Sequence, residues 1–498
     1  MYAVWAGLAA CSLEPPLRLP QIASGPGYTA GAPPQRTGGV RVSGGQAQTF
    51  VYGRNLSQKW WELFHSRKLD AAVRRALRDS PGIAAAQAQL RQARASMEAS
   101  AGIFYPQVGA TLGASRQKVS GATLGGRIPG YTYSLFTGGV NVTYYPDIFG
   151  LNRLIYRGSR AQVEYQRYEL AAARLTLSGN VVNAAIAEAA TGAQITATQD
   201  IIARERELLA LVQVQYRSGA SPYASVLAQR AQLFAEEATL PPLQQQRAVY
   251  RHLLAILSGE APDRRHSPPF VLDGLVLPQN IPVSLPSTLL RHRPDIQAAV
   301  QQMRYALAQI GVAKAQFYPL VTLSASAGTS SPTTGAYFDS SSSVWGIAAS
   351  LAQPIFEGGR LKAQERGAYA AYDTTLAVYK STVLAAFQQV ADALRALEHD
   401  AAAVQAQSRA LRTARQELKI TGAGYRAGSN DYLALLSAEV AFQNARIAAV
   451  RAVAQRYQDT AALFVALGGY WQQGRTDEVS SASHQGATAR STRTGKSP

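Results

Sequence analysis

The sequence predicts an α+β membrane protein made by an internal tandem duplication, with a small membrane sheet joined to long coiled-coil helices. Three observations support this fold class. Short motifs recur in the same order in both halves, four segments alternate apolar and polar residues, and two long stretches carry an apolar residue at every seventh position. These periods are those of a repeat, a one-sided strand and a coiled coil.

The duplication is visible in motifs that keep their order and spacing. Phe104-Tyr105-Pro106 is echoed by Phe317-Tyr318-Pro319, and Tyr216-Arg217-Ser218-Gly219 by Tyr425-Arg426-Ala427-Gly428. Several matches at nearly constant separation are the signature of a repeat. The chain is therefore divided into a leader 1–11, a Pro/Gly-rich tether 12–50, a first repeat 51–260, a linker 261–285, a second repeat 286–470, and a basic, Ser/Thr-rich tail 471–498 that is expected to be disordered.

Each repeat is expected to run as a short helix, two strands and two long helices. No proline lies between Pro146 and Pro222 or between Pro354 and Pro498, so long helices can continue without a break. A seam of seven-residue steps predicts coiled-coil packing. Its members are Leu376, Val383, Val390, Leu397, Val404, Leu411, Leu418 and Tyr425 in the second repeat, and Ile195, Ile202, Leu209 and Tyr216 in the first. A helix over 152–216 would be about 98 Å long.

The strands are predicted at 107–115, 136–144, 320–328 and 345–351, where apolar and polar residues alternate. Gly/Ser-rich loops join the two strands of each pair, and aromatic residues such as Tyr105, Tyr144 and Tyr318 flank their other ends. An apolar band bordered by aromatics is typical of membrane strands. The edge of a soluble β-sandwich is the alternative interpretation. Because no run of about 18 uninterrupted apolar residues follows the leader, strands rather than helices are expected to cross the membrane.

Four strands cannot enclose a lumen, and an open sheet edge in lipid leaves backbone groups unpaired at a cost on the order of several kcal/mol each. Further copies of the chain are therefore expected to complete the sheet, with the polar strand faces lining a wet interior. The same symmetry would arrange the long helices as a second tube. The sequence thus predicts a homo-oligomeric conduit.

The only cysteine, Cys11, follows Leu8-Ala9-Ala10, a small-residue approach like those that lipoprotein signal peptidases cleave. We expect Cys11 to carry a lipid, with the Pro/Gly-rich segment as a tether between the lipid and the body. The leader has no Lys or Arg before Cys11 and is shorter than an ordinary signal peptide. An ordinary buried cysteine is the alternative.

Composition and motifs argue against several other classes. One cysteine is too few for a disulfide framework or for thiolate-based zinc and iron–sulfur sites. The net charge of +18 is compatible with nucleic acid or an anionic lipid surface. Arginines are nevertheless spread along Ala/Gln-rich helices, which disfavours a nucleic-acid-binding coiled coil. The six histidines are scattered and no zinc-protease, hydrolase or nucleotide motif occurs, so no enzyme, catalytic residue, metal or cofactor is expected.

Several motifs together resemble those of the TolC-type outer membrane factors of tripartite efflux systems, especially the lipoprotein branch of OprM and NodT-type proteins. Besides the repeated motifs above, they are Trp60–Phe64, Tyr145–Gly150, Arg291–Ile296 and Gln353–Arg360. The resemblance implies a trimer whose twelve-stranded outer membrane β-barrel takes four strands per chain and continues into a periplasmic α-helical barrel. It also implies a passive exit duct for drugs or other small molecules, fed by a periplasmic adaptor and an inner membrane pump of the RND type.

The resemblance also places functional positions at the ends of the long helical hairpins. Arg217, Gly219, Arg426 and Gly428 would lie at tips that face the adaptor. The segment that narrows the pore in the family matches 432–437, with Leu433 at the apolar constriction. Ser437 stands where many relatives have an acidic residue, so a closed tip would depend more on Leu433 and on contacts of Tyr425.

Alternatives remain at this level. Leu433 is also compatible with plain coiled-coil packing, and His292 in the RHRPDI motif with capping or packing where a helix begins. The whole chain is also compatible with a structural envelope lipoprotein or a coiled-coil scaffold that transports nothing.

Overall fold

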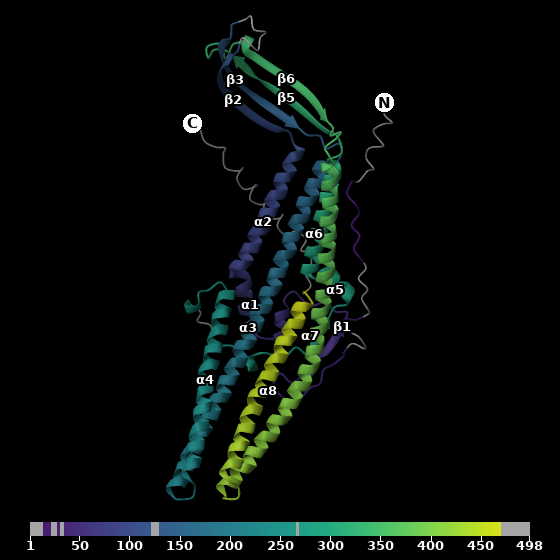
Figure 1. The fold of residues 1–498 in the computed structure, drawn as a ribbon. Helices are drawn as coiled ribbons and strands as arrows, with labels where there is room; N and C mark the ends of the chain where they lie inside the picture. The colour runs from purple at the N-terminus through teal and green to yellow at the C-terminus, as the bar shows by residue number, and fades with distance from the viewer. Residues whose placement is uncertain (1–12, 21–26, 30–33, 121–128, 265–267, 470–498) are drawn as a thin grey trace, which may run out of the picture.

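The computed structural model describes residues 13–20, 27–29, 34–120, 129–264 and 268–469. The chain is elongated, with four strands at one end and two helical hairpins at the other (Figure 1). The leader, Cys11 and the predicted disordered tail lie outside the described residues.

The two halves repeat the same elements in the same order. The first half contains β1 (Thr49–Tyr52), α1 (Arg67–Asp79), α2 (Pro81–Ala101), β2 (Gln107–Val119), β3 (Tyr131–Tyr144), α3 (Leu151–Arg217) and α4 (Tyr223–Leu257). The second contains β4 (Asn280–Val283), α5 (Pro286–His292), α6 (Pro294–Ala315), β5 (Leu320–Ser331), β6 (Ser343–Ala352), α7 (Arg360–Arg426) and α8 (Tyr432–Ala466). The α3 and α7 helices have 67 residues each, and α4 and α8 have 35 each, which confirms the duplication.

One predicted feature of the repeat is wrong. Each half has two helices before its strands, where the sequence indicated one short helix. The reason is local, since Pro81 and Pro294 each begin a new helix at a first-turn position where a missing N–H costs nothing. The small parallel pair β1–β4 was not predicted either.

The described part of the 12–50 segment is not a free tether. The guanidinium of Arg456, on α8, is fully buried and donates to Thr37 Oγ1 (2.9 Å), Gln48 Oε1 (3.2 Å) and the Gly44 carbonyl (3.4 Å). A Pro/Gly-rich segment cannot form a core by itself, but here it packs against the helices of the body. It then leads into β1, which lies along the flank of the helices (Figure 1).

The four long strands form one antiparallel sheet in the order β2-β3-β5-β6, each strand a few residues longer than predicted. The register aligns one face that is apolar and strongly exposed, with Leu112 at 87% and Ile347 at 79% exposure. The opposite face carries Gly, Ser, Thr and Asn, for example Thr111, Asn141 and Ser326. Because β2 and β6 have no partner on their outer sides within the sheet, the chain supplies an open piece of a larger structure.

The long helices pack along the predicted seam, which is buried or half-buried at all eight of its positions in α7. In α3 the seam ends early, because Tyr216 is 45% exposed while its counterpart Tyr425 is 8% exposed. Both α3 and α7 begin after a glycine in the left-handed region, Gly150 (φ 81°) and Gly359 (φ 88°), where a side chain would be strained. The strand-to-helix turn therefore depends on these glycines.

Two described helices satisfy the length and composition of a membrane span, although no uninterrupted apolar run is present. They are α3, with 61% of its most apolar window buried, and α8, with 28% of that window buried. Core helices of soluble proteins meet the same criterion.

Candidate functional site

The two hairpin ends have nearly the same backbone. Gly219 (φ 77°) and Gly428 (φ 79°) adopt the left-handed conformation that ends each long helix, and their N–H groups bond to the carbonyls of Tyr216 (3.0 Å) and Tyr425 (3.1 Å). The carboxylate of Asp431 caps the start of α8 by accepting from the Ala434 N–H at 2.8 Å. Both hairpin turns are thus short, and the second also has a side-chain cap, whereas α4 begins after Pro222 without one.

Two of the sequence-predicted tip residues, Arg217 and Arg426, are exposed on these turns. Each guanidinium folds back onto a carbonyl of its own helix, Gln213 at 3.4 Å and Gly422 at 3.1 Å. Neither carries an ion pair with a carboxylate among the described residues. The two tips therefore present a positive charge each to an incoming partner.

Leu433 and Ser437 lie one helical turn apart on α8 and are both exposed, Leu433 at 70%. Leu435, between them, is 4% exposed and packs inside the chain. Leu433 is thus not a core residue of its own hairpin, and the chain leaves an apolar side chain outside at this point.

A polar network joins the first hairpin to the second just behind the tips. The Tyr432 hydroxyl donates to Gln229 Oε1 at 2.6 Å, and the Tyr425 hydroxyl donates to Gln215 Oε1. Further from the tip, Gln443 Nε2 on α8 donates to a carboxylate oxygen of Glu205 on α3 at 2.7 Å. These bonds connect residues more than 200 positions apart in the sequence, so the relative position of the two hairpins depends on them.

Two carboxyl groups, those of Glu205 and Glu439, lie beside this network with little access to water. Glu205 is 1% exposed, and burial raises its pKa against the opposing effect of the amide donors of Gln229 and Gln443. On α8, burial and the charge of Glu205 raise the pKa of Glu439 to about 7, although Arg204 opposes the shift. Sequence patterns missed this cluster, since its members come from three helices.

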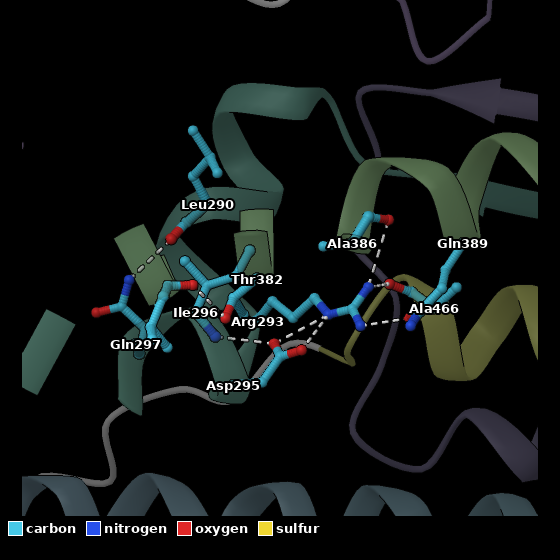
Figure 2. Close-up of polar contacts among 10 residues, drawn as sticks. Leu290, Arg293, Asp295, Ile296, Gln297, Thr382, Ala386, Gln389 and Ala466 are labelled. Atoms are coloured by element: carbon cyan, nitrogen blue, oxygen red, sulfur yellow. Dashed lines mark hydrogen bonds and ion pairs between the residues drawn. The ribbon is translucent and has the colours of Figure 1, made fainter. Parts of the chain in front are cut away.

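The RHRPDI motif has a structural role at the other end of α8. Arg293, 7% exposed, forms an ion pair with Asp295 (2.9 Å) and donates to Gln389 and to the carbonyl of Ala466 at 2.8 Å (Figure 2). Ala466 is the last residue of α8, whose terminal carbonyls lack helical partners and attract a cation. His292 is half-buried at the end of α5, so Arg293 and not His292 makes the key contacts of the motif.

Aromatic side chains mark the junction between the sheet and the helices. Phe149 stacks on Tyr318 with ring centroids 5.1 Å apart, and Phe104 meets Tyr156 edge-on at 5.9 Å. Tyr105 is 70% exposed beside them. Among all the residues that the structure describes, no three His, Cys, Asp or Glu side chains are grouped as a metal site.

A sheet with one lipid-compatible face and one polar face, continued by helices about 100 Å long, defines a membrane channel protein with a helical extension. The chain belongs to the outer membrane efflux protein family, whose model matches residues 72–260 and again 285–469. The two matches cover the two halves described above.

Individual relatives agree with this assignment. Pyoverdine export outer membrane protein OpmQ of Pseudomonas aeruginosa is 29% identical over 428 residues, which cover 84% of this chain and 88% of that protein. Probable outer membrane lipoprotein SilC of Salmonella typhimurium is 24% identical over 417 residues, or 83% and 88% of the two chains. The solved structure of outer membrane protein VceC from Vibrio cholerae is 29% identical, has a TM-score of 0.78 and covers 84% of this chain and 100% of that one.

The family, the fold class and the outer membrane location predicted from the sequence are confirmed. The chain is an outer membrane channel component of an efflux system, with its helices in the periplasm. Its fold is that of the trimeric barrel-and-helix channels.

Proposed function

We propose that three copies of this chain form a passive exit duct for small molecules, which enter at the helical tips from an adaptor and an inner membrane pump and leave through the barrel. The duct needs no chemistry of its own, because the pump supplies both the energy and the choice of cargo. The proposal rests on two features of the single chain: the unpaired outer edges of its sheet and the exposed apolar stripe on its helices.

The sheet is unfinished at both edges. In the hydrocarbon region, the unpaired N–H and C=O groups of β2 and β6 would cost on the order of several kcal/mol each. Since β2 and β6 run antiparallel across the sheet, β6 of one copy can pair with β2 of the next in the same antiparallel manner. Three copies give twelve strands and a lumen lined by the polar face.

The helices are unfinished as well. The α4 helix packs on α3 but leaves an apolar stripe exposed along its length. The stripe consists of Tyr223, Leu227, Phe234, Val249, Leu253 and Ile256, each more than 40% exposed. Apolar residues repeated along one side of a helix require a partner helix. A neighbouring copy supplies it without new sequence, and the same rotation closes sheet and helices together.

A structural lipoprotein without transport does not explain the polar sheet face. A scaffold function does not require a sheet face of Gly, Ser, Thr and Asn opposite an apolar, lipid-compatible face. A water-filled lumen requires this alternation. The family match to efflux channels supports the same choice.

Three finer assignments belong to this proposal. Cys11 carries the lipid that anchors the chain to the outer membrane, and the relative SilC is likewise described as a probable outer membrane lipoprotein. The tips with Arg217, Gly219, Arg426 and Gly428 receive the adaptor. Three copies of Leu433 form the apolar constriction, with Ser437 one turn above and the Tyr425 contact holding the hairpins together.

Planar-bilayer recording on the protein purified from outer membranes, with its mass measured on the same sample, tests the duct. We expect a trimer with small, gated currents. Leu433→Glu places three charges at the constriction and is expected to raise the conductance, while Leu433→Met keeps an apolar ring and is expected to leave it unchanged. A monomer without currents contradicts the duct, and an unchanged Leu433→Glu channel contradicts the constriction.

A further inference from the structure

A basic groove lies between α3 and α6, in the part of the helices nearest the sheet. It has a volume of about 670 Å³ and is also lined by Leu17 of the N-terminal segment. Its charged lining residues are Arg157, Arg160, Arg167, Arg304, Glu14 and Glu164. The duct described above makes no use of this groove.

Two of the four arginines have no carboxylate partner among the described residues. Arg157 pairs with Glu14 at 2.8 Å, and Arg167 pairs with Glu164 at 3.1 Å. Arg304 donates only to the neutral amide oxygen of Gln301, at 3.3 Å. Arg160 forms no hydrogen bond or ion pair with any residue that the structure describes. The groove therefore has a surplus of two positive charges and unused guanidinium donors.

The groove lies close to the membrane. Helix α3 begins at Leu151, seven residues after β3 ends at Tyr144, and Arg157 and Arg160 follow six and nine residues later. At 1.5 Å per residue, they lie about 9 and 14 Å along the helix. Side chains of a helix lean toward its N-terminus, which for α3 is the membrane end (Figure 1). The Arg157 and Arg160 side chains thus lean toward the periplasmic leaflet, and Arg304 lies eleven residues, or about 17 Å, before the sheet end of α6 at Ala315.

The basic side of α3 faces outward from the tube. The N-terminal segment lies in the groove through Glu14, and Cys11 is three residues away, a reach of about 11 Å at most. A segment anchored in lipid runs outside the lumen, so this step depends on the proposed lipidation. On its other side α3 lines a separate groove toward α2 with Gln162, Gln166 and other mostly uncharged residues.

A neighbouring copy is not positioned to fill the groove. The membrane-proximal helices pack in the order α2, α3, α6 and α7, so α3 and α6 are the two inner members of the chain's own layer. The edges where another copy packs are α2 and α7. An occupant of the groove therefore comes from the surrounding membrane or periplasm.

We propose that this groove binds the phosphate-bearing headgroup of an anionic phospholipid in the periplasmic leaflet, with Arg160 and Arg304 as its main contacts. Guanidinium groups bind phosphate oxygens in pairs of hydrogen bonds, and each basic group near an anionic membrane surface strengthens binding about fivefold. Two such contacts give about a thirtyfold preference for an anionic over a zwitterionic lipid. The bound lipid fixes the depth of the channel in the membrane, at the level where the N-terminal segment leaves the membrane.

Native mass spectrometry of the full-length trimer in detergent tests this site by titration with phosphatidylglycerol and phosphatidylcholine. We expect phosphatidylglycerol to bind about thirtyfold more tightly. The Arg160→Gln, Arg304→Gln double variant is expected to lose this preference, while the matched Arg409→Gln, Arg412→Gln variant, exposed on α7 far from the groove, keeps it. Equal affinity for both lipids, or an equal loss in the α7 variant, overturns the site.

Further measurements separate this inference from the duct, from the lipid anchor and from a soluble ligand. The groove variant is expected to keep its trimer mass and its conductance, so loss of lipid preference leaves the exit function intact. Cys11→Ala is expected to retain phosphatidylglycerol binding, because the arginines belong to the helices. If glycerophosphate competes at the same concentration as the lipid, the groove takes a soluble phosphorylated molecule and the lipid assignment is wrong.

Discussion

Glu439 gives the contact between the two hairpins a pH dependence that one substitution can reduce. In the structure its pKa is raised to about 7 from an ordinary 4.5, by burial first and by the charge of Glu205 second. When the hairpins separate, water reaches the carboxyl group and its pKa returns toward 4.5. The joined arrangement therefore binds the proton more tightly than the separated one.

The sign follows from this difference. A carboxyl group with a raised pKa stabilises the joined arrangement fully below pH 4.5 and loses that contribution as the pH rises through about 7. A shift of this size corresponds to about 3 kcal/mol, which partial exposure of Glu439 reduces to about 2 kcal/mol. We thus expect the open probability to rise about thirtyfold between pH 5 and pH 8. The raised pKa of Glu205 and of Glu236 acts in the same direction.

Single-channel recording at pH 5, 6, 7 and 8 measures this effect. Glu439→Gln replaces the carboxyl by a neutral group of the same shape, so the variant should stay mostly closed at pH 8 and respond weakly to pH. Glu207→Gln, at an exposed position of α3, is the matched control and should behave as the wild type. If Glu439→Gln follows the wild-type pH curve, the reasoning from burial is refuted.

Three other substitutions have defined outcomes. Cys11→Ala should abolish labelling by a radioactive acyl precursor and leave the trimer assembled, whereas retained label would exclude Cys11 as the lipid site. Arg293→Leu should lower the free energy of unfolding by about 2 kcal/mol, measured by chemical denaturation, because it leaves the Ala466 carbonyl and the Gln389 amide oxygen without their donor; a loss under about 1 kcal/mol would contradict that role. Tyr425→Phe removes one bond between the hairpins and should raise the open probability about fivefold at constant pH, and no change would mean that this bond does not hold the tip.

Local patterns in the sequence were sufficient for the long elements. The α3 helix was predicted nearly to its ends, as 152–216, and the predicted seam from Leu376 to Tyr425 lies within α7, because a seven-residue seam and the absence of proline act within one segment. The four strands were found from alternation alone, although the ends furthest from the helices were missed, where in β2 Arg116 and Lys118 interrupt the alternation.

Other features depend on contacts between distant segments and leave no local pattern. The Tyr216 and Tyr425 positions have the same motif, yet only Tyr425 is buried, since only it meets the other hairpin. Arg293 was overlooked beside His292 because its partners lie on α7 and α8. Glu205 is bonded to residues 24 and 238 positions away.

The claim that one chain supplies only a third of the barrel can be tested by disulfide cross-linking in native outer membranes. Each variant carries Cys11→Ala and two introduced cysteines, one at Thr111 of β2 and one at Ala348 or Ser350 of β6. These two are then the only thiols of the chain. The control places cysteines at Asn141 and Ser326, which are register partners within one chain.

On oxidation, at least one β2–β6 pair should give a covalent dimer and a covalent trimer, with no larger product, because the third bond closes the ring. The Asn141–Ser326 control should form its disulfide without a change in mass. Absence of intermolecular products from every edge pair, or a ladder that continues beyond three copies, would contradict the closed trimeric barrel.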